Sequence, residues 1–217
     1  TNGGSITIGS SIDSGNSYEF IDGDDIQEQN TFDGDTWKRS EADAILKGGY
    51  LATITSDLEN QLASAATLEN GSYRGAWIGI YRDKDANGGT GSAAYTWRYA
   101  EGSPEEGIAF FQQNTGGAGG SPIDGRYNNF FGDENGGEPN GIGPNGESVG
   151  QFFGNQALWN DLRGTVSFSP SMGSEFDVMG YVLEKDLGAS NVSLNAGSGN
   201  VTIGGGVGTS KALGTLQ

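Results

Sequence analysis

Glycine is spread unevenly along this chain, and its distribution constrains the fold more than any other feature. The two ends, residues 1–16 and 188–217, consist almost entirely of small and polar residues and are rich in glycine. All four tryptophans and most of the charged residues lie between them, at 17–187. Only this middle part has enough large aromatic side chains to bury a core. The sequence therefore predicts one folded domain at 17–187, with a different kind of segment on each side.

The two ends resemble each other. Gly3–Ser11 reads GGSITIGSS and Ser198–Gly206 reads SGNVTIGGG, while Asn191–Ser198 is a weaker third copy. Alternating apolar residues bounded by Gly and Ser are typical of short strands with one buried face. Such strands at close spacing are typical of β-repeat arrays, although a flexible Gly/Ser linker has a similar composition. We interpret 1–16 and 188–217 as β-repeat or linker segments of a longer protein.

The chain contains no cysteine and no histidine. Thiolate and imidazole metal sites are excluded, and the commonest general base is missing. A bound metal ion must be held by oxygen, which favours Ca²⁺ or Mg²⁺. The remaining routes to catalysis are carboxylate pairs, for which Asp133 and Glu134 are candidates, or metal-assisted hydrolysis. Because no nucleophile stands beside a base, we predict a binding module and not an enzyme.

The charge balance excludes two classes of partner. There are 11 basic and 28 acidic residues, giving a net charge of −17. Nucleic acid and anionic membrane surfaces would repel such a chain, and no apolar run approaches the length of a membrane span. Excess carboxylate suits a divalent cation or an exposed, well-solvated surface. We expect an extracellular or cell-surface location, without nucleic-acid binding or membrane insertion.

The predicted elements within 17–187 form an α+β order. Strands are expected at 17–21, 50–54, 76–81, 94–99, 158–159 and 179–186, and helices at 36–47 and 56–67. Asp35 or Thr36 is the expected N-cap of the first helix, and Ser56 to Glu59 form a capping box for the second. Between Ala100 and Ala157 no regular element is predicted. A loop of this length inside a compact domain is expected to be functional.

That loop carries a set of oxygen donors. Glu138-Pro139-Asn140 is followed by Glu147 and then by Trp159-Asn160-Asp161. Carboxylate and amide oxygens are ligands of Ca²⁺, which takes about six to eight of them. A cis bond at Glu138–Pro139 would turn the side chains on either side of it in the same direction. On spacing alone, a cation site and a set of solvated loop residues are both open.

These residues resemble the sugar-binding signature of C-type lectins. The other motifs of that family occur in its order: GGYLATITSDLEN at 48–60, WIGI at 77–80, YTWRYAEGSP at 95–104 and GYVLEKD at 180–186. The resemblance covers 17–187. It implies a C-type lectin-like α+β fold with paired terminal strands, two helices, small antiparallel sheets and a long calcium-binding loop.

By matching position, the resemblance implies that Glu138, Asn140, Glu147, Asn160 and Asp161 bind Ca²⁺ and that the first four contact a sugar. The Glu-Pro-Asn form implies the vicinal diols of mannose, glucose, GlcNAc or fucose, because two hydroxyls complete the calcium shell while carboxylates accept and amides donate hydrogen bonds. The expected partner is a cell-surface or extracellular glycan. The alternative is a lectin-like scaffold that binds a protein or another non-sugar ligand. Together with the repeat-like ends, this predicts the adhesive module of a large bacterial adhesin.

The chain departs from the family at two places. Val149 stands where a cysteine is common, so packing must replace the disulfide. About twenty residues are inserted at Glu105–Arg126, and we expect them to reshape the rim of the site. Five aromatic residues flank the motif, of which we expect at most one to contact a sugar: Tyr127, Phe130, Phe131, Phe152 and Phe153.

A further acidic segment precedes the 95–104 motif. Asp83, Asp85 and Asn87 copy the first half of an EF-hand loop, but Ala94 occupies the twelfth position, where that loop needs an acidic residue. A second metal site and a solvated hairpin turn are both open for this segment.

Overall fold

The chain divides into two compact units, one comprising Thr1–Ser17 with Lys185–Gln217 and the other Tyr18–Glu184. The computed structural model describes residues 6–8, 15–26, 34–82, 95–114, 118–132, 137–141, 146–154, 156–171, 173–187 and 201–203. Among these residues, none of the helices is both long enough and apolar enough to cross a membrane.

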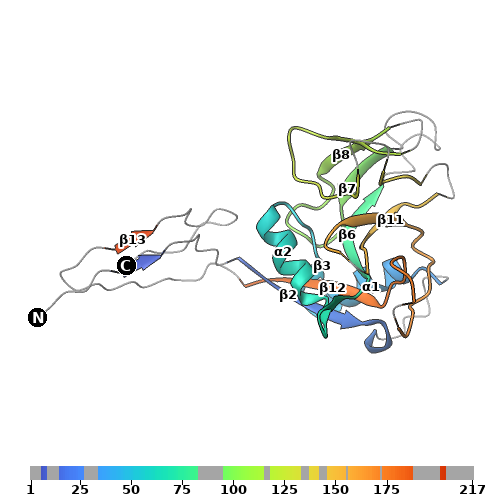
Figure 1. Ribbon diagram of the computed structural model, residues 1–217, viewed down its shortest axis with the longest axis horizontal. Coiled ribbons are helices and arrows are strands. Elements are labelled where there is room, and N and C mark those ends of the chain that lie inside the picture. The colour runs from blue at the N-terminus through green and yellow to red at the C-terminus, as the bar shows by residue number, and fades with distance from the viewer. Residues whose placement is uncertain are drawn as a thin grey trace, which may run out of the picture. The chain divides into compact units, whose positions relative to one another are not determined.

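The first unit contains a pair of parallel strands, β1 (Ile6–Ile8) and β13 (Val201–Ile203; Figure 1). Ile6 lies opposite Val201, and Ile8 lies opposite Ile203. This register matches the alignment of the two similar sequence segments, residue for residue. Successive coils of a β-repeat array stack equivalent residues in the same way. The third segment, at 191–198, lies outside the described residues.

The second unit is built on a nine-stranded sheet. Its main path runs β11-β10-β6-β7-β8-β9. The strand β12 pairs with β6 of this path, and β2 and β3 pair with β12. The strands are β2 (Asn16–Asp22), β3 (Tyr50–Leu51), β6 (Ala76–Arg82), β7 (Thr96–Tyr99), β8 (Ala109–Gln113), β9 (Gly120–Pro122), β10 (Val149–Phe152), β11 (Trp159–Leu162) and β12 (Gly180–Asp186). A separate hairpin pairs β4 (Leu68–Glu69) with β5 (Ser72–Tyr73), and a 3-10 turn spans Gly23–Asp25. With its helices, this unit has the predicted α+β class.

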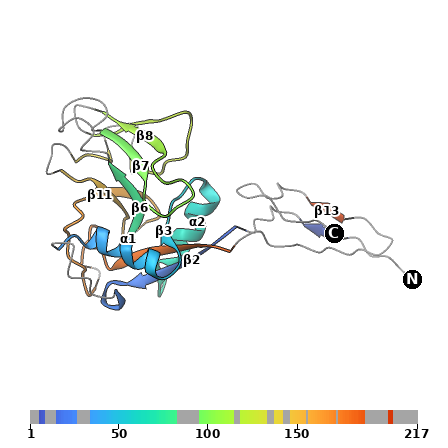
Figure 2. The ribbon, with the colours of Figure 1, turned by 180° about the vertical axis from the view of Figure 1, so that it is seen from behind.

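The strands nearest the two ends of this unit pair with each other, as expected (Figures 1 and 2). The Gly23 N–H donates to the Met179 carbonyl at 2.8 Å, and the Leu187 N–H donates to the Gly15 carbonyl at 3.1 Å. The strand β12 also runs parallel to β6, with Tyr181 opposite the β6 tryptophan. This parallel contact joins what the sequence predicted as small separate sheets into one.

The first helix, α1 (Thr36–Leu46), begins where its N-cap predicts. The Asp35 carboxylate accepts a hydrogen bond from the Lys38 N–H at 2.9 Å. Gly48, with a φ of 77°, follows the helix end in the left-handed region that favours glycine.

The second helix, α2 (Asp57–Ala66), is capped by Ser56, whose hydroxyl accepts from the Glu59 N–H at 3.2 Å. The Glu59 carboxylate does not return to the N-cap residue. It accepts instead from the N–H and hydroxyl of Thr55, each at 2.7 Å. The predicted capping box therefore forms with Thr55, the residue before the N-cap, as the partner of Glu59.

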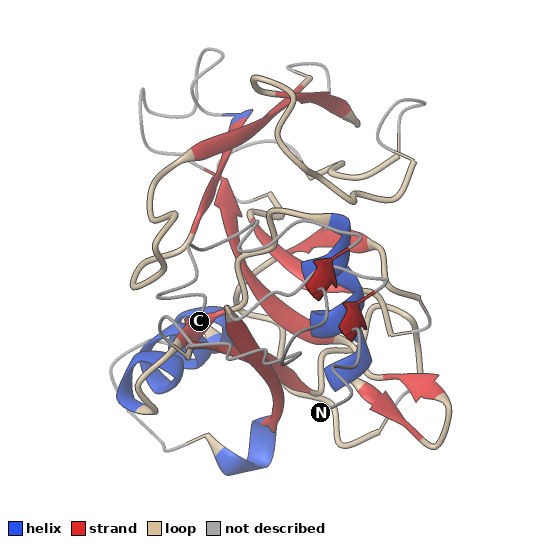
Figure 3. Ribbon diagram, turned by 90° about the vertical axis from the view of Figure 1, so that its left-hand side faces the viewer, coloured by secondary structure: helices blue, strands red, loops and turns tan. Residues whose placement is uncertain are grey.

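The expectation that 100–157 lacks regular elements was wrong, because β8, β9 and β10 lie there. Phe110 and Phe111 are consecutive and both buried, so β8 lacks the alternation that identifies a half-exposed strand. The strand β10 is short and contains Gly150 and the polar Gln151. The inserted segment 105–126 forms β8 and β9, which extend the sheet beyond β7. Much of the remaining chain in Figure 3 is loop between these strands.

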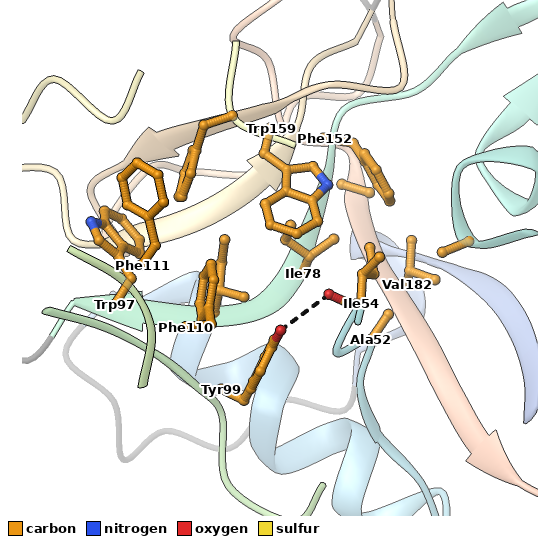
Figure 4. Close-up of a cluster of buried hydrophobic side chains, with 14 residues drawn as sticks. Ala52, Ile54, Ile78, Trp97, Tyr99, Phe110, Phe111, Phe152, Trp159 and Val182 are labelled. Carbon is orange, nitrogen blue, oxygen red and sulfur yellow. Dashed lines mark hydrogen bonds between the residues drawn. The ribbon is translucent and has the colours of Figure 1, made fainter. Parts of the chain in front are cut away.

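A core of aromatic and aliphatic side chains packs around the sheet (Figure 4). Trp159 is fully buried at its centre, and its indole N–H donates to Asn60 Oδ1 at 2.9 Å. The Tyr99 hydroxyl donates to the Ile54 carbonyl at 3.3 Å. Val149 is buried in a second apolar cluster. The core fixes β11 and with it the residues that follow Trp159.

Candidate functional site

The Glu138–Pro139 peptide bond is cis. Glu138 and Pro139 are buried, whereas Asn140 is exposed. The Asn140 side-chain amide donates to Glu138 Oε1 at 2.9 Å, so the two polar side chains of the motif lie on the same side. One of them faces solvent, where a ligand can reach it.

Asp161 on β11 connects this segment to the sheet. Its two carboxylate oxygens accept the backbone N–H groups of Asn140 and Gly141, each at 2.8 Å. A Cβ at Gly141 would lie 2.5 Å from the Glu147 Cβ and 2.8 Å from Asp161 Oδ2. Only glycine fits this position, because Glu147 and Asp161 close on it from two sides.

The carboxyl groups of this site are crowded. Burial, followed by the nearby Asp161 and then the charge of Glu147, raises the pKa of Glu138 to about 9. Burial and Asp161 also raise the pKa of Glu147, while Arg163 and Arg82 act in the opposite direction. Glu138 therefore carries a proton at neutral pH unless a cation compensates its charge.

Four of the five predicted calcium ligands are brought together by these contacts, namely Glu138, Asn140, Glu147 and Asp161. Asn160 is adjacent to Asp161 in the chain, but it lies opposite Gln151 in the β10–β11 ladder. Side chains alternate along a strand, so Asn160 and Asp161 leave β11 on opposite faces. Asn160 is 2% exposed, and among the described residues its side-chain nitrogen has no hydrogen-bond partner.

The donor set fits a hard cation. Glu138 Oε2 is buried and, within the described part of the chain, accepts no hydrogen bond. Among the described residues, each Asp161 oxygen accepts one backbone N–H, and an ionised carboxylate offers about four lone-pair positions in total. The described residues contain no three Asp or Glu side chains already arranged as a metal site. For such a site to form, Glu138 must lose its proton, because a charged carboxylate is the form that binds a hard cation.

Asp83, Asp85 and Asn87, the second candidate metal site, lie outside the described residues. The same holds for Asp133 and Glu134.

Two residues that sequence analysis did not select contact the same loop. Arg82, at the end of β6, is 3% exposed and donates to the Gly141 carbonyl. Gln113, at the end of β8, donates to the Pro139 carbonyl at 3.0 Å and to the Gly141 carbonyl at 3.2 Å. No pattern in the sequence marks either residue. One follows an apolar strand, and the other lies in the segment for which no strand was predicted.

The flanking aromatic residues differ in exposure. Phe130, Phe152 and Phe153 are buried, and Tyr127 is half-buried. Phe131 is 48% exposed, and its carbonyl accepts the Glu138 N–H at 2.7 Å. It is the exposed ring of the five, and it lies beside the candidate site.

No family model matches the chain, and no curated protein matches it. Its similarity is to solved C-type lectin structures. The human scavenger receptor C-type lectin carbohydrate-recognition domain is 17% identical, covering 80% of this chain and 92% of that one, with a TM-score of 0.43. The mouse counterpart is 18% identical, covering 71% and 84%, with a TM-score of 0.41. The domain of cow CD23, in the presence of a GlcNAc2Man3 oligosaccharide, is 18% identical, covering 80% and 87%, with a TM-score of 0.41.

Proposed function

We propose that this chain is a calcium-dependent carbohydrate-binding module of the C-type lectin type. The carrying observation is the meeting of Glu138, Asn140, Glu147 and Asp161 at one place, from a loop and a packed strand. Each of these side chains offers a carboxylate or amide oxygen as a metal ligand. One buried carboxylate oxygen, Glu138 Oε2, has no hydrogen-bond partner among the described residues. A hard divalent cation satisfies both the oxygen preference and the excess negative charge.

In this proposal the calcium ion supplies a centre to which two adjacent sugar hydroxyls bind. Glu138 and Glu147 accept the hydrogens of these hydroxyls, and Asn140 donates to their oxygens. Asp161 holds the ion and the loop backbone together. Asn160 is included as a ligand on the resemblance alone.

The sugar class follows from the pattern of acid and amide. Glu138 with Asn140 suits mannose, glucose, GlcNAc or fucose, and the reversed pattern suits galactose. The double variant Glu138→Gln with Asn140→Asp is expected to weaken this preference and to admit galactose. A wild-type protein that already prefers galactose on a glycan array would contradict this assignment.

The biological setting we propose is an extracellular adhesin with β-repeats, of bacterial type. The supporting observation is the parallel register of β1 and β13, whose sequences are similar. The domain at 17–187 would then be inserted between two neighbouring strands of a repeat array, with 1–16 and 188–217 belonging to the array. One shallow sugar site binds weakly, so many copies would act together.

Two measurements test the central proposal. Saturating Ca²⁺ should raise the melting temperature relative to EDTA, because binding to the native state stabilises it by mass action. Glycan-array binding should be lost in EDTA. Identical melting in both conditions would refute calcium binding. Calcium binding without any glycan signal would instead favour the alternative, a lectin-like scaffold for a protein ligand.

A further inference from the structure

The candidate loop is held by side chains that are not among its predicted ligands. Arg82 and Gln113 come from the ends of two strands, β6 and β8, and both are buried. Their contacts all go to the backbone of the Glu-Pro-Asn segment and the glycine that follows it. These contacts fix the position of the chain, whichever ligand its side chains take.

Side chains bind both kinds of backbone group in this segment, the N–H groups and the carbonyls. On one side, the N–H groups of Asn140 and Gly141 donate to Asp161. On the other, the carbonyls of Pro139 and Gly141 accept from Gln113, and Arg82 also donates to the Gly141 carbonyl. A segment without a regular element of its own is thereby hydrogen-bonded almost as a strand would be.

The amide of Gln113 is oriented by a third residue. The Trp97 indole N–H, a group that can only donate, donates to Gln113 Oε1 at 3.2 Å. Arg82 Nη1 donates to the same oxygen at 3.4 Å. With Oε1 fixed as the acceptor, Gln113 Nε2 must face the loop carbonyls as a donor.

The guanidinium also brings charge to the site. Burial lowers the pKa of the Arg82 guanidinium, whereas the carboxylates of Asp161 and Glu147 act in the opposite direction. The Tyr95 ring lies 5.7 Å from the guanidinium carbon, within the range of a cation–π contact. Arginine stays charged in such settings and presents a rigid fork of donors. A permanent positive charge therefore lies next to the carboxylates that crowd the loop.

We propose that Arg82, together with Gln113, is a positioning residue that holds the 138–141 segment in its binding-ready conformation before any metal ion binds. The proposal deepens the proposed function, because the positioned groups are the proposed ligands. It differs from the proposed function because the 138–141 segment is already ordered when no calcium is bound. A loop that is ordered in advance loses less conformational entropy on binding.

Amide hydrogen exchange in EDTA tests this directly, with wild type, Arg82→Met and Arg98→Met compared. Arg98 is a matched control, because it also donates from a strand to a loop glycine carbonyl, that of Gly107 at 2.8 Å. In Arg82→Met, the amides of Asn140 and Gly141 should exchange at least about tenfold faster than in wild type. In Arg98→Met they should exchange at the wild-type rate. The amides of Tyr99 and Ile123, bonded within the sheet region, report in the same experiment that the core is folded.

Two more variants separate geometry from charge. Gln113→Met removes neutral donors only and should also speed exchange of the loop amides, while Trp97 and its neighbours stay packed. Arg82→Lys keeps a positive charge and should recover part of the protection lost in Arg82→Met. Equal exchange in the Lys and Met variants would overturn the role of the charge.

Unchanged protection of Asn140 and Gly141 in Arg82→Met, with the core amides intact, would overturn the whole proposal. This outcome is independent of whether the wild-type protein binds calcium, because the measurement is made in EDTA. Loss of protection in a protein that binds no calcium would refute the proposed function and leave the positioning role standing. If both hold, added Ca²⁺ should restore protection in Arg82→Met.

Discussion

Two buried glutamates, Glu184 and Glu138, show how differently this domain treats an acidic side chain in its interior. Glu184 on β12 accepts from the Thr53 N–H at 2.9 Å and from the Tyr50 hydroxyl at 3.2 Å. Burial raises its pKa to about 8. Glu138 in the loop has a pKa of about 9, but one of its oxygens has no partner among the described residues, and a second carboxylate lies close to it.

This difference indicates which of the two glutamates stabilises the fold. Satisfied polar groups in an interior stabilise one packed arrangement, whereas an unsatisfied one costs about 1–3 kcal/mol. The contacts of Glu184 come from Tyr50 on β3 and from Thr53 just after that strand, and they fix the position of this segment. Within the described residues, Glu138 Oε2 has no such donor, and a buried carboxyl that is only partly satisfied is the expected property of a ligand and not of a structural residue.

The largest effect is expected for Asp161→Ala. This substitution removes a charge close to Glu138 and the hydrogen bonds to the backbone N–H groups of Asn140 and Gly141. Calcium and sugar affinity should each fall by at least about 100-fold, because a hydrogen-bonded buried charge is lost. The Trp159 core should stay folded. Asp177→Ala is the control, since Asp177 also accepts two backbone N–H groups, of Gly173 and Ser174, in another loop. Calorimetric titration with wild-type affinity in Asp161→Ala would show that the site lies elsewhere.

The next effect is the pH dependence of the free energy of unfolding that Glu184 causes. A folded-state pKa of about 8, above the ordinary 4.5, means that the protonated carboxyl stabilises the fold. This contribution is complete below about pH 4.5 and is lost as pH rises through 8. The free energy of unfolding in EDTA should therefore decrease between these values by up to about 5 kcal/mol, since one pKa unit corresponds to about 1.4 kcal/mol. Denaturant titrations of wild type and Glu184→Gln should show a weaker pH dependence in the variant; equal slopes would contradict the assignment.

A smaller effect is expected for Gly141→Ala. The added methyl would lie 2.5 Å from the Glu147 Cβ, so the loop must move away from β11. Overpacking of this kind costs about 1–3 kcal/mol, which corresponds to a loss of about tenfold or more in calcium affinity. Gly125→Ala is the control, because a Cβ there meets nothing within 4 Å and only its positive φ of 67° is strained. Equal calcium affinity of the two variants would mean that the 141 position does not shape the site.

The smallest effect is expected at Gln151, a third kind of buried polar side chain. It is fully buried on β10, and neither of its amide atoms has a partner within the described residues. Gln151→Met keeps the volume and should stabilise the fold by about 1 kcal/mol in EDTA. Gln113→Met should have the opposite sign, because that amide is hydrogen-bonded. Destabilisation by Gln151→Met in thermal melts would show that the amide is satisfied in solution.

Local sequence rules were sufficient for the helices and for most of the strands. The caps at Asp35 and Ser56 act within four residues of chain, so their hydrogen bonds could be read from the sequence. The resemblance carried by the residues at 138–140, 147 and 159–161 also pointed to four residues that lie close together, namely Glu138, Asn140, Glu147 and Asp161. What they bind remains a prediction, as does the role of Asn160.

Only the tertiary structure decided how the loop is held. Arg82 contacts a carbonyl 59 residues away, and Gln113 contacts one 28 residues away. Contacts at these separations follow from the register of β6, β7 and β8, and β8 has no alternation that reveals it. The same packing, and not the sequence pattern, buries Phe130 and leaves Phe131 exposed. Burial and long-range pairing depend on where strands meet, and a local pattern carries no information about that meeting.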